Sequence, residues 1–568
     1  VVETLAPPVL LLPTEIEKSQ DPKDRPKTAK RYRLRGDFLV HCHVEMHMML
    51  GLVAILRSHQ TVWLTPKQAQ ELEATVGLPL DPGNNACPVV TLDRCATTVA
   101  GRWEELPGLP EITFMHAVLL PNSSRLLYWG YGPRADQSRM WDQVTGLYTS
   151  PANQPQALTP DENIWSGAHA HLNDDNGTVL VHAGFLIGGP PVTPDTERRS
   201  FLFDPPTRTW SVTADLHVGR FYPTSVTLAD GKPLTLFGED HAHAAGTGVQ
   251  SFEIFKPGAG GGSWSAPTTV PFNYFYYPWT FLLPLGDLFI AGPQKPARRF
   301  DPAATPIVDD PMRRYDQVFD QRGVNMDGTA VLLPLRPPLY RPRVLIAGGI
   351  PPTDQTAEWI DLSAPAPAWE ALPNLNVPRD KLNCVLLPDG RVFIAGGVLS
   401  LSDGGPAELF DPENPADGFQ LGPSMKHIRG YHSAAILMPD GSVVMGGDSN
   451  GGGDGGAIPN ERYLPSYFFK PRPTITSSPP AISYGAPFAV QTPLPNAIAE
   501  VVLMRAGAVT HGFNQNQRYV GCTITGATAA SVEATAPPDG NVAPPGHYLL
   551  FLVDQDRIPS LGAWIRLT

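Results

Sequence analysis

The chain has 568 residues, of which 42% are hydrophobic and 17% charged, a composition that excludes a disordered protein and fits a folded one. Its formal net charge of −13 argues against a nucleic-acid partner, and no apolar run reaches the ~18 residues of a membrane span. Glycine and proline together make up about a fifth of the residues, which indicates many turns and an all-β protein of short strands.

The first 64 residues contain one distinctive motif, HCHVEMH at residues 41–47, between two predicted strands. One thiolate with three nearby imidazoles suits a soft transition metal. Side chains alternate along a strand, so His41 and His43 lie on one side and Cys42 on the other, and one strand can serve two metal centres. A structural zinc site is the alternative, but it would want a second pair of cysteines, and none is nearby.

This segment resembles the C-terminal copper motif of multicopper oxidases over about residues 31–64. By that resemblance, Cys42 and His47 are ligands of a type 1 copper, and His41 and His43 belong to a trinuclear copper cluster. A complete multicopper oxidase has further copper-binding histidines that are missing here. The resemblance therefore implies a second polypeptide that supplies the remaining cupredoxin domains and their ligands.

The segment that follows links this motif to the rest of the chain. Residue 1 is Val, so we expect that a leader has been removed or that the chain begins inside a larger product. Residues 65–98 are interpreted as a short helix and a linker. Cys87 and Cys95 either form a disulfide, which would indicate an oxidising compartment, or remain free thiols. With copper as the expected cofactor, we expect a secreted or periplasmic protein.

Residues 99–470 contain an internal repeat. An apolar run that ends in a small residue and glycine recurs seven times at intervals of about 50 residues, as in VLVHAG, VLIAGG and VFIAGG. Most copies are followed by a signature such as FDP, and several then by a tryptophan. This pattern is typical of the kelch repeat and predicts a propeller of seven four-stranded antiparallel blades. GRWEELP at residues 101–107 resembles the ends of other blades and is predicted to close the ring.

After residue 470 the pattern changes to alternating apolar and polar residues, with turns about every ten residues. It predicts an Ig-like β-sandwich over residues 471–568. The predicted fold class is therefore all-β, with a partial cupredoxin segment at residues 1–64, a seven-bladed propeller at 99–470 and the sandwich at the end.

Four residues outside the first motif are candidates for chemistry. Tyr222, Tyr431 and His432 lie at the starts of predicted blade strands, and His511 lies on a loop of the sandwich. Each residue alone is explained better by a structural hydrogen bond. Together with the closing segment GHYLLFLVDQDRIPSLGAWIRL, they make residues 99–568 resemble galactose oxidase and glyoxal oxidase, copper radical enzymes with a kelch propeller and a C-terminal Ig-like domain.

The resemblance implies a role for each of these residues. By it, Tyr431, His432 and His511 are copper ligands, and Tyr222 is the tyrosine that carries the radical. Its cofactor would be a copper ion in the propeller, separate from any copper in the first 64 residues, and its substrate a small molecule.

Two positions depart from that family. Trp165 or Ser166 stands where the family has a cysteine that forms a thioether bond to the radical tyrosine. We therefore expect no thioether bond at Tyr222 and no stable tyrosyl radical. His241 stands where the family has a tryptophan that stacks on the radical.

Four histidines form two His-x-His pairs at predicted blade ends. His169 and His171 alternate on one strand, and His241 and His243 follow another. They are interpreted either as additional ligands of the propeller copper, because neutral imidazoles suit copper, or as histidines of surface loops.

Three functions follow from these patterns. The first is a copper oxidoreductase in which a multicopper oxidase part, completed by another polypeptide, is fused to a copper-binding propeller and oxidises a substrate with O2. The second is a catalytically silent propeller that binds a substrate or partner. The third is a galactose oxidase-like alcohol or aldehyde oxidase without the Tyr–Cys cross-link. Loss of the cysteine favours the silent module, whereas the four retained positions oppose it.

Overall fold

The protein forms two compact units, Val1–Ala100 and Gly101–Thr568. In the first unit, the computed structural model describes four strands by their backbone alone. In the second unit it describes all residues except 131–136, 156–163, 185–195, 240–247, 259, 320–321, 324–326, 399–402 and 449–457.

The first unit contains two antiparallel strand pairs in its described part. They are β1 (Lys30–Arg33) with β4 (Thr61–Leu64), and β2 (Gly36–His41) with β3 (Val53–Ser58). The strands predicted on either side of the histidine motif are therefore present as β2 and β3.

The predicted ligands Cys42, His43 and His47 lie outside the described residues, and of His41 only the backbone is described. The type 1 copper and the trinuclear cluster therefore stay predictions. The same holds for the helix and linker predicted at residues 65–98.

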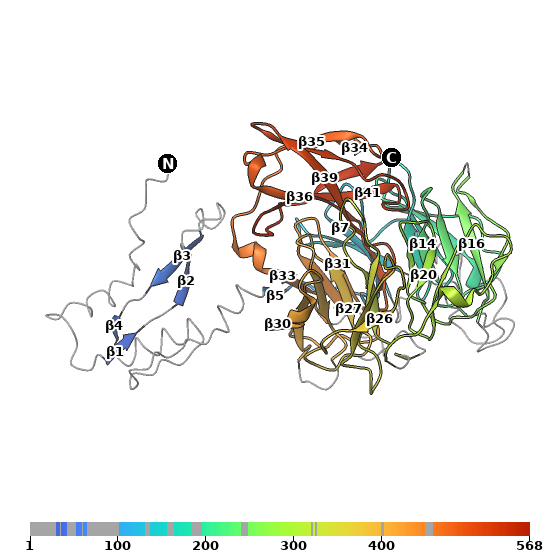
Figure 1. Cartoon of the computed structure of the whole chain (residues 1–568), viewed down its shortest axis with the longest axis horizontal. Helices are drawn as coiled ribbons and strands as arrows, with labels where there is room; N and C mark the ends of the chain where they lie inside the picture. Colours follow the sequence, from blue (N-terminus) through green and yellow to red (C-terminus); the bar gives the residue numbers. More distant parts are fainter. Residues whose placement is uncertain are drawn as a thin grey trace. The chain divides into compact units, whose positions relative to one another are not determined.

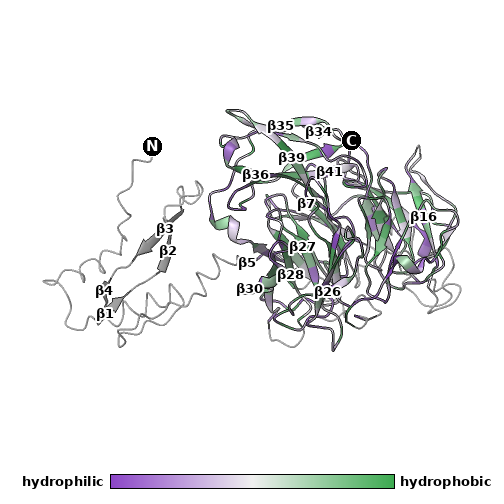
Figure 2. Cartoon of the chain, in the orientation of Figure 1, coloured by the Kyte–Doolittle hydropathy of each residue, from purple (hydrophilic) through white to green (hydrophobic). Residues whose placement is uncertain are grey.

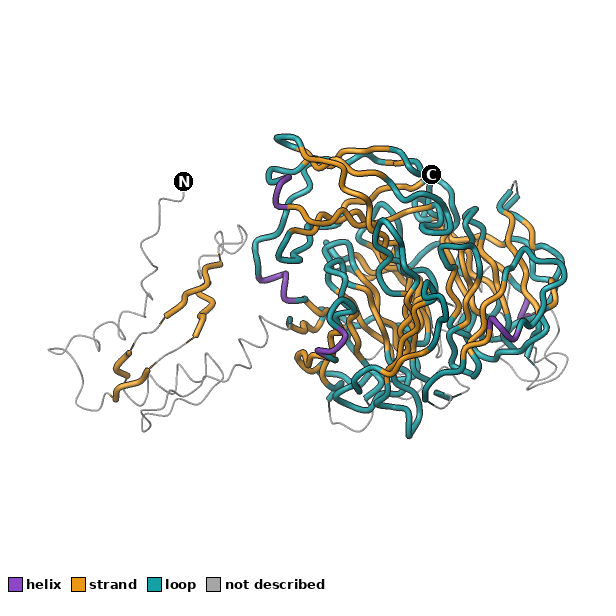
Figure 3. The backbone as a smooth tube through the Cα atoms, viewed as in Figure 1, coloured by secondary structure: helices purple, strands orange, loops and turns teal. Residues whose placement is uncertain are grey.

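The described part of the second unit contains the seven antiparallel blades of a propeller (Figures 1 and 3). The first four blades have these strands: β6 (His116–Leu119), β7 (Arg125–Trp129), β8 (Ser138–Asp142) and β9 (Tyr148–Thr149); β10 (Ala168–His171), β11 (Val179–His182), β12 (Ser200–Asp204) and β13 (Thr209–Val212); β14 (Thr224–Thr227), β15 (Pro233–Leu236), β16 (Ser251–Lys256), β17 (Ser263–Trp264) and β18 (Thr268–Thr269); β19 (Thr280–Leu282), β20 (Leu288–Ile290), β21 (Ala297–Phe300) and β22 (Arg314–Tyr315).

The last three blades repeat the same order. Their strands are β23 (Thr329–Leu332), β24 (Arg343–Ala347), β25 (Ala357–Asp361) and β26 (Trp369–Ala371); β27 (Asn383–Leu386), β28 (Val392–Ala395), β29 (Pro406–Phe410) and β30 (Phe419–Ser424); β31 (Ser433–Leu437), β32 (Val443–Gly447), β33 (Glu461–Leu464) and β5 (Arg102–Glu105). In the last blade, Trp103 of β5 lies opposite Tyr463 of β33, so the predicted closure of the ring by residues 101–107 is confirmed.

The repeated apolar runs form the inner strands because each blade is covered on both faces by its neighbours. All four residues of β28, VFIA, are buried, and so are all five of β31, SAAIL. A short, continuously apolar run is what a strand buried on both faces requires. Figure 2 shows the resulting concentration of hydrophobic residues in the inner strands such as β27 and β28.

Four blades share a buried ion pair between an arginine that precedes an inner strand and a glutamate on the third strand. The pairs are Arg220–Glu253, Arg322–Glu358, Arg379–Glu408 and Arg429–Glu461. Several of these guanidinium groups also donate to main-chain carbonyls, as Arg379 does to Gly396 over 2.8 Å. The repeat thereby satisfies its own buried charges.

The sandwich follows as a seven-stranded sheet in the order β34-β42-β41-β36-β39-β40-β35 (orange to red in Figure 1). Its strands are β34 (Ala481–Ile482), β35 (Pro487–Gln491), β36 (Ile498–Arg505), β39 (Tyr519–Ala527), β40 (Ser531–Thr535), β41 (Gly546–Asp554) and β42 (Ala563–Leu567). The helices of the described part are short 3-10 turns, Thr196–Arg198, Pro311–Arg313, Pro415–Asp417, Ser466–Phe469 and Pro495–Ala497. None of them is long and apolar enough to cross a membrane.

One hairpin leaves the sandwich and joins the propeller. It consists of β37 (Ala508–Thr510) and β38 (Phe513–Asn514), and β37 pairs antiparallel with β6, the inner strand of the first blade. Thr510 lies opposite His116 in this register. The hairpin therefore carries residues of the sandwich to the inner strands of the blades.

Candidate functional site

Two tyrosines from different blades meet at their hydroxyl groups. Tyr222 precedes β14 and Tyr431 precedes β31, and their Oη atoms lie 2.6 Å apart. Tyr222 is buried and has a φ of 57°, a left-handed conformation that is rare for a bulky side chain and is found most often at functional sites. Its N–H donates to the carbonyl of Ser166 over 3.1 Å, which helps to hold it in this conformation.

His511 reaches the tyrosines from the tip of the β37–β38 hairpin. Because Thr510 pairs with Phe513, His511 and Gly512 are the two central residues of the turn, and both have positive φ, 49° and 77°. Such a turn matches the twist of a two-residue hairpin. A side chain at Gly512 would collide with the carbonyl of Leu382, so this position requires glycine.

The four side chains predicted as the propeller copper site are brought together around His511. Its ring centroid lies 5.1 Å from that of Tyr222, 5.2 Å from that of Tyr431 and 5.3 Å from that of His432. His432 and His511 are buried, whereas Tyr431 is half-buried. Residues far apart in the sequence thus converge on one point.

The imidazole of His511 has one nitrogen in a hydrogen bond and one without a partner. Nδ1 lies 2.7 Å from Thr510 Oγ1, while Nε2 is buried and has no hydrogen-bond partner among the described residues. Burial, followed by the charges of His432 and His169, lowers the pKa of His511 well below its usual value, so the ring is neutral. A neutral imidazole with a free, buried nitrogen is the form that binds a metal.

His432 and the two phenols complete the donor set. His432 Nδ1 lies 3.5 Å from the buried carboxylate of Asp448. Burial and the neighbouring Tyr222 raise the pKa of Tyr431, and burial raises that of Tyr222. The described residues hold no group of three His, Cys, Asp or Glu side chains placed for one metal ion, so a metal here would rely on two imidazoles and phenol oxygen.

His116 is a member of the site that the sequence did not reveal. Its Nε2 accepts a hydrogen bond from Ser166 N–H over 3.0 Å and lies 3.4 Å from Thr510 Oγ1. The hydroxyl of Thr510 can therefore donate to His116 while it accepts from Nδ1 of His511, which leaves the lone pair on Nε2 of His511. His116 sits inside the apolar run FMHAVLL, and no motif marks it.

His169 and His171, both predicted as possible copper ligands, have different surroundings in the structure. His169 is buried beside His116 and Trp129, with ring centroids 5.4 Å and 5.0 Å away. His171 has Nε2 2.9 Å from the carbonyl of Leu119 and Nδ1 3.0 Å from Asn516 Nδ2. Both nitrogens of His171 are thus used in packing contacts, and none is left for a metal; both histidines are buried rather than on surface loops.

The remaining predicted positions are resolved only in part. His241 and His243 lie outside the described residues, so their role as ligands stays a prediction. Ser166, where the thioether cysteine was expected, does lie beside the site through its backbone contacts with Tyr222 and His116. Trp165 packs in the same apolar cluster as Tyr222.

Comparison with known proteins agrees with this architecture. Residues 472–567 match the family model "Galactose oxidase-like, Early set domain". The chain is 26% identical over 517 residues to a galactose oxidase of Gibberella zeae. The aligned region covers 82% of this chain and 71% of that protein. It is 25% identical over 552 residues to an aldehyde oxidase of Arabidopsis thaliana, covering 82% and 84%.

The fold comparison gives the same answer. A solved structure described as a novel fungal alcohol oxidase with catalytic diversity among the AA5 family, in complex with copper, superposes with a TM-score of 0.67. The match has 21% identity and covers 83% of this chain and all of the other. The chain is similar in sequence to galactose oxidase and has the fold of that solved structure.

The similar proteins support only part of the sequence-based expectations. The curated relatives are named galactose oxidase and aldehyde oxidase, and none of the matches described above is a multicopper oxidase. The galactose oxidase-like assignment therefore rests on the propeller and the sandwich. The multicopper oxidase resemblance rests on about residues 31–64, around the motif at residues 41–47.

Proposed function

We propose that this galactose oxidase-like chain is a copper oxidase that uses O2 to oxidise a small alcohol or aldehyde at the propeller site. The observation that carries the proposal is the convergence of Tyr222, Tyr431 and His432 on a buried His511 whose Nε2 has no partner. The relatives named galactose oxidase and aldehyde oxidase support the reaction class.

The donor set fits a copper ion. His432 and His511 would hold it through imidazole nitrogen, and Tyr431 and Tyr222 would contribute phenol oxygen; such nitrogen and oxygen donors suit copper. When bound, copper supplies one-electron oxidation and reduction at the ligands. Thr510, which also contacts His116, holds the proton of His511 on Nδ1, so that the lone pair of Nε2 would be available to the metal.

The reaction must balance two electrons. Conversion of an alcohol to an aldehyde removes two electrons and two protons, and O2 takes up both to give hydrogen peroxide. A second one-electron centre is therefore needed beside the metal, and the phenol of Tyr222, enclosed by Phe221 and Tyr277, is the oxidisable side chain at the site. Since Trp165 or Ser166 stands at the position of the family's cysteine, Tyr222 stays free of a thioether and carries no stable radical at rest.

Substrate approaches from the side of the half-buried tyrosines. Tyr431 and Tyr276 are only partly covered, and Tyr276 donates a hydrogen bond to Glu239 over 2.6 Å. On the other side, Lys381 lies 5.8 Å from the ring centroid of Tyr431 and pairs with Asp380 over 2.7 Å. A rim with these polar groups favours a hydroxylated or hydrated substrate over an apolar one.

The test is metal content and peroxide formation in the full chain. After copper loading and dialysis, we expect hydrogen peroxide from a panel of primary alcohols and aldehydes. The double variant His432→Ala, His511→Ala should lose one copper per chain and at least about 100-fold of the peroxide rate. Cys42→Ser is the matched control, because it removes a ligand of the other predicted copper site and should leave peroxide formation unchanged.

Other results would redirect the assignment. An unchanged copper content in the double variant would show that the ligands are wrongly chosen. Copper retained at this site without peroxide would favour the silent binding module, for which the replacement of the cysteine by Trp165 or Ser166 is the supporting observation. The mass of the peptide that contains Tyr222 tests whether a thioether bond is present. We expect the mass of the unmodified peptide.

We further propose that the first unit is part of a multicopper oxidase site, completed by a second polypeptide, in a secreted or periplasmic protein. The motif HCHVEMH at residues 41–47 supports this proposal. Native material should then show a second chain on a denaturing gel and a blue colour that Cys42→Ser abolishes, because thiolate-to-copper charge transfer produces the colour. A colourless, single-chain protein would refute it.

A further inference from the structure

Two arginines lie side by side where the sandwich meets the propeller. Arg505 ends β36, Arg518 precedes β39, and the N–H of Arg505 donates to the carbonyl of Arg518 over 2.9 Å. Only 4% and 6% of the two residues is exposed. Like charges opposite each other on neighbouring strands repel, so this pair needs a compensating negative charge.

No side chain in the described part of the chain provides an ion pair for either guanidinium. Arg518 donates to the carbonyls of Val542, Leu282 and Asn541 over 2.6, 2.9 and 2.7 Å, and Arg505 donates to that of Pro544 over 2.8 Å.

Asp539, whose carboxylate acts on Arg518 electrostatically, is exposed and accepts hydrogen bonds from the main-chain N–H groups of Asn541 and Val542 instead. Burial lowers the pKa of Arg518 to about 10, and Arg505 adds to this lowering. The pair is therefore undercompensated.

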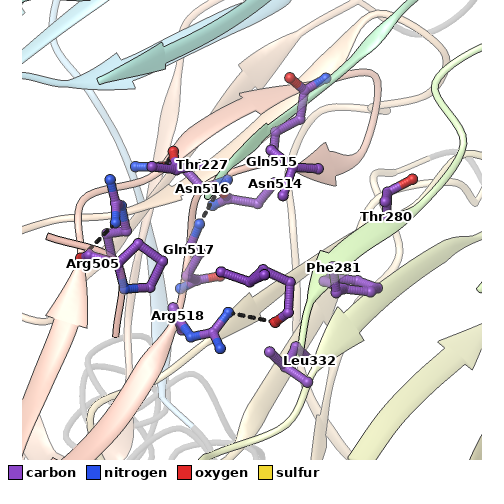
Figure 4. Close-up of a pocket in the computed structure, with 13 residues that line it drawn as sticks. Thr227, Thr280, Phe281, Leu332, Arg505, Asn514, Gln515, Asn516, Gln517 and Arg518 are labelled. Atoms are coloured by element: carbon purple, nitrogen blue, oxygen red, sulfur yellow. Dashed lines mark hydrogen bonds between the residues drawn. The ribbon is translucent and has the colours of Figure 1, made fainter. Parts of the chain in front are cut away.

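The two arginines face a small polar cavity (Figure 4). Its volume is about 30 Å³, and besides the arginines it is lined by amide side chains of the segment 514–517 and by Phe281 and Leu332. A water molecule needs roughly 10–15 Å³ of such space. The cavity thus has room for a particle the size of one or two waters.

The amide groups around the cavity add donors rather than acceptors. Gln515 Oε1 accepts from Ser225 N–H over 3.2 Å, which fixes the amide so that Nε2 is the free end. That Nε2 is buried and has no hydrogen-bond partner among the described residues. The amide of Gln517, by contrast, is fully used by the main chain of Leu386.

We propose that this cavity binds a small monovalent anion of the halide class, with chloride as the physiological ion. Arg505 and Arg518 supply positive charge and N–H donors, Gln515 lines the same cavity, and the anion replaces the missing carboxylate. Gln515 and Arg518 belong to the same segment as the hairpin that carries His511, so the anion fastens the base of that hairpin to the propeller.

Thermal unfolding of the full chain tests the proposal. The melting temperature should rise with chloride over roughly a hundredfold range of concentration and exceed by about 2–5 °C the value in gluconate at equal ionic strength. Crystals grown in bromide should show anomalous density between Arg505 and Arg518. Equal melting temperatures in the two salts would overturn the proposal, and bromide density without that dependence would mean binding at crystal concentration only.

A charge substitution separates this site from a general salt effect. Gln515→Glu keeps the acceptor for Ser225 and places a carboxylate in the wall of the cavity that the arginines also line, so the variant should melt higher in gluconate than the parent and lose its dependence on chloride. Gln420→Glu, an exposed position on β30, is the matched control and should keep that dependence. Persistence of the chloride effect in Gln515→Glu would contradict the site.

Discussion

The blades and the segment 505–518 treat buried polar groups in opposite ways. In the blades, a buried arginine such as Arg379 finds both a carboxylate and a carbonyl within its own repeat. In the segment from the sandwich, Nε2 of His511 has no hydrogen-bond partner among the described residues, and the arginine pair has carbonyl acceptors but no ion-paired carboxylate among them. The buried ion pairs of the blades compensate each other's charge, whereas the inserted segment brings buried polar atoms to the blades that no ion pair compensates. The free lone pair of His511 Nε2 indicates a cation at the tip of the hairpin. The positive charge of Arg505 and Arg518 indicates an anion at its base.

The largest effect is expected where the blades lose their internal pairing. Glu408→Gln would leave the guanidinium of Arg379 buried without its counter-charge, at a cost of about 3–5 kcal/mol in the free energy of unfolding. Denaturant unfolding of the full chain measures this loss. Glu370→Gln, on an exposed position, should change stability by less than about 0.5 kcal/mol. Equal effects of the two substitutions would remove the contrast between blades and inserted segment.

A smaller effect is expected at His511, where the proposed copper site lies. His511→Ala removes the imidazole whose Nε2 has no partner and should weaken copper binding roughly 100-fold or more, a loss of about 2.7 kcal/mol. Equilibrium copper titration against a competing chelator measures the affinity. The chloride dependence of the melting temperature should survive in this variant, because the arginine pair is untouched. Loss of both properties together would show that the two ends are not independent.

The next smaller effect is expected at Thr510, which would act on copper binding through its contact with His511. Thr510→Val removes the hydroxyl that lies 2.7 Å from His511 Nδ1, so the tautomer of His511 is no longer fixed. We expect a loss of about tenfold in copper affinity, and Thr510→Ser should restore it because serine keeps the hydroxyl. The melting temperature separates this effect from unfolding, since both variants should melt close to the parent. Failure of serine to rescue would mean that the methyl group matters, not the hydrogen bond.

The smallest effect concerns a buried histidine that already has a partner. His547 Nε2 lies 3.0 Å from the carbonyl of Asp174, and burial lowers the pKa of His547 below its usual value of about 6.5. The unfolded chain therefore takes up the proton first as the pH falls, so the contribution to stability is present above about pH 6.5 and decreases below it. His547→Gln should flatten the fall in stability from neutral to acidic pH by less than about 1.4 kcal/mol per pH unit. Melting temperatures of both proteins across that range provide the measurement, and identical slopes would contradict the assignment.

The sequence predicts the architecture well because each blade is encoded locally. The apolar runs, their glycines and the strand at residues 101–107 specify buried strands and the closing pair with β33 without knowledge of distant contacts. Tyr222, Tyr431, His432 and His511 were found through the resemblance to a family, and the structure brings them together.

Other features depend on which residues face each other across strands. His116 was missed because its contacts with Ser166 and Thr510 depend on the register of β37 against β6. The pairing of Arg505 with Arg518 likewise follows from the register of two strands rather than from any local motif. His171 resembled a ligand because alternation alone does not reveal that Leu119 and Asn516 use both of its nitrogens.

The pairing of β37 with β6 also sets the order in which the molecule is completed during its synthesis. The two strands are almost 400 residues apart, and a chain grows from its N-terminus, so the blades emerge long before the hairpin does. Until then, the inner edge of β6 is unpaired and the tyrosines have no His511 beside them. The proposed metal site is therefore assembled last, after the blades that surround it, and a partly made chain lacks the side chain of His511 that the proposed copper ligation requires.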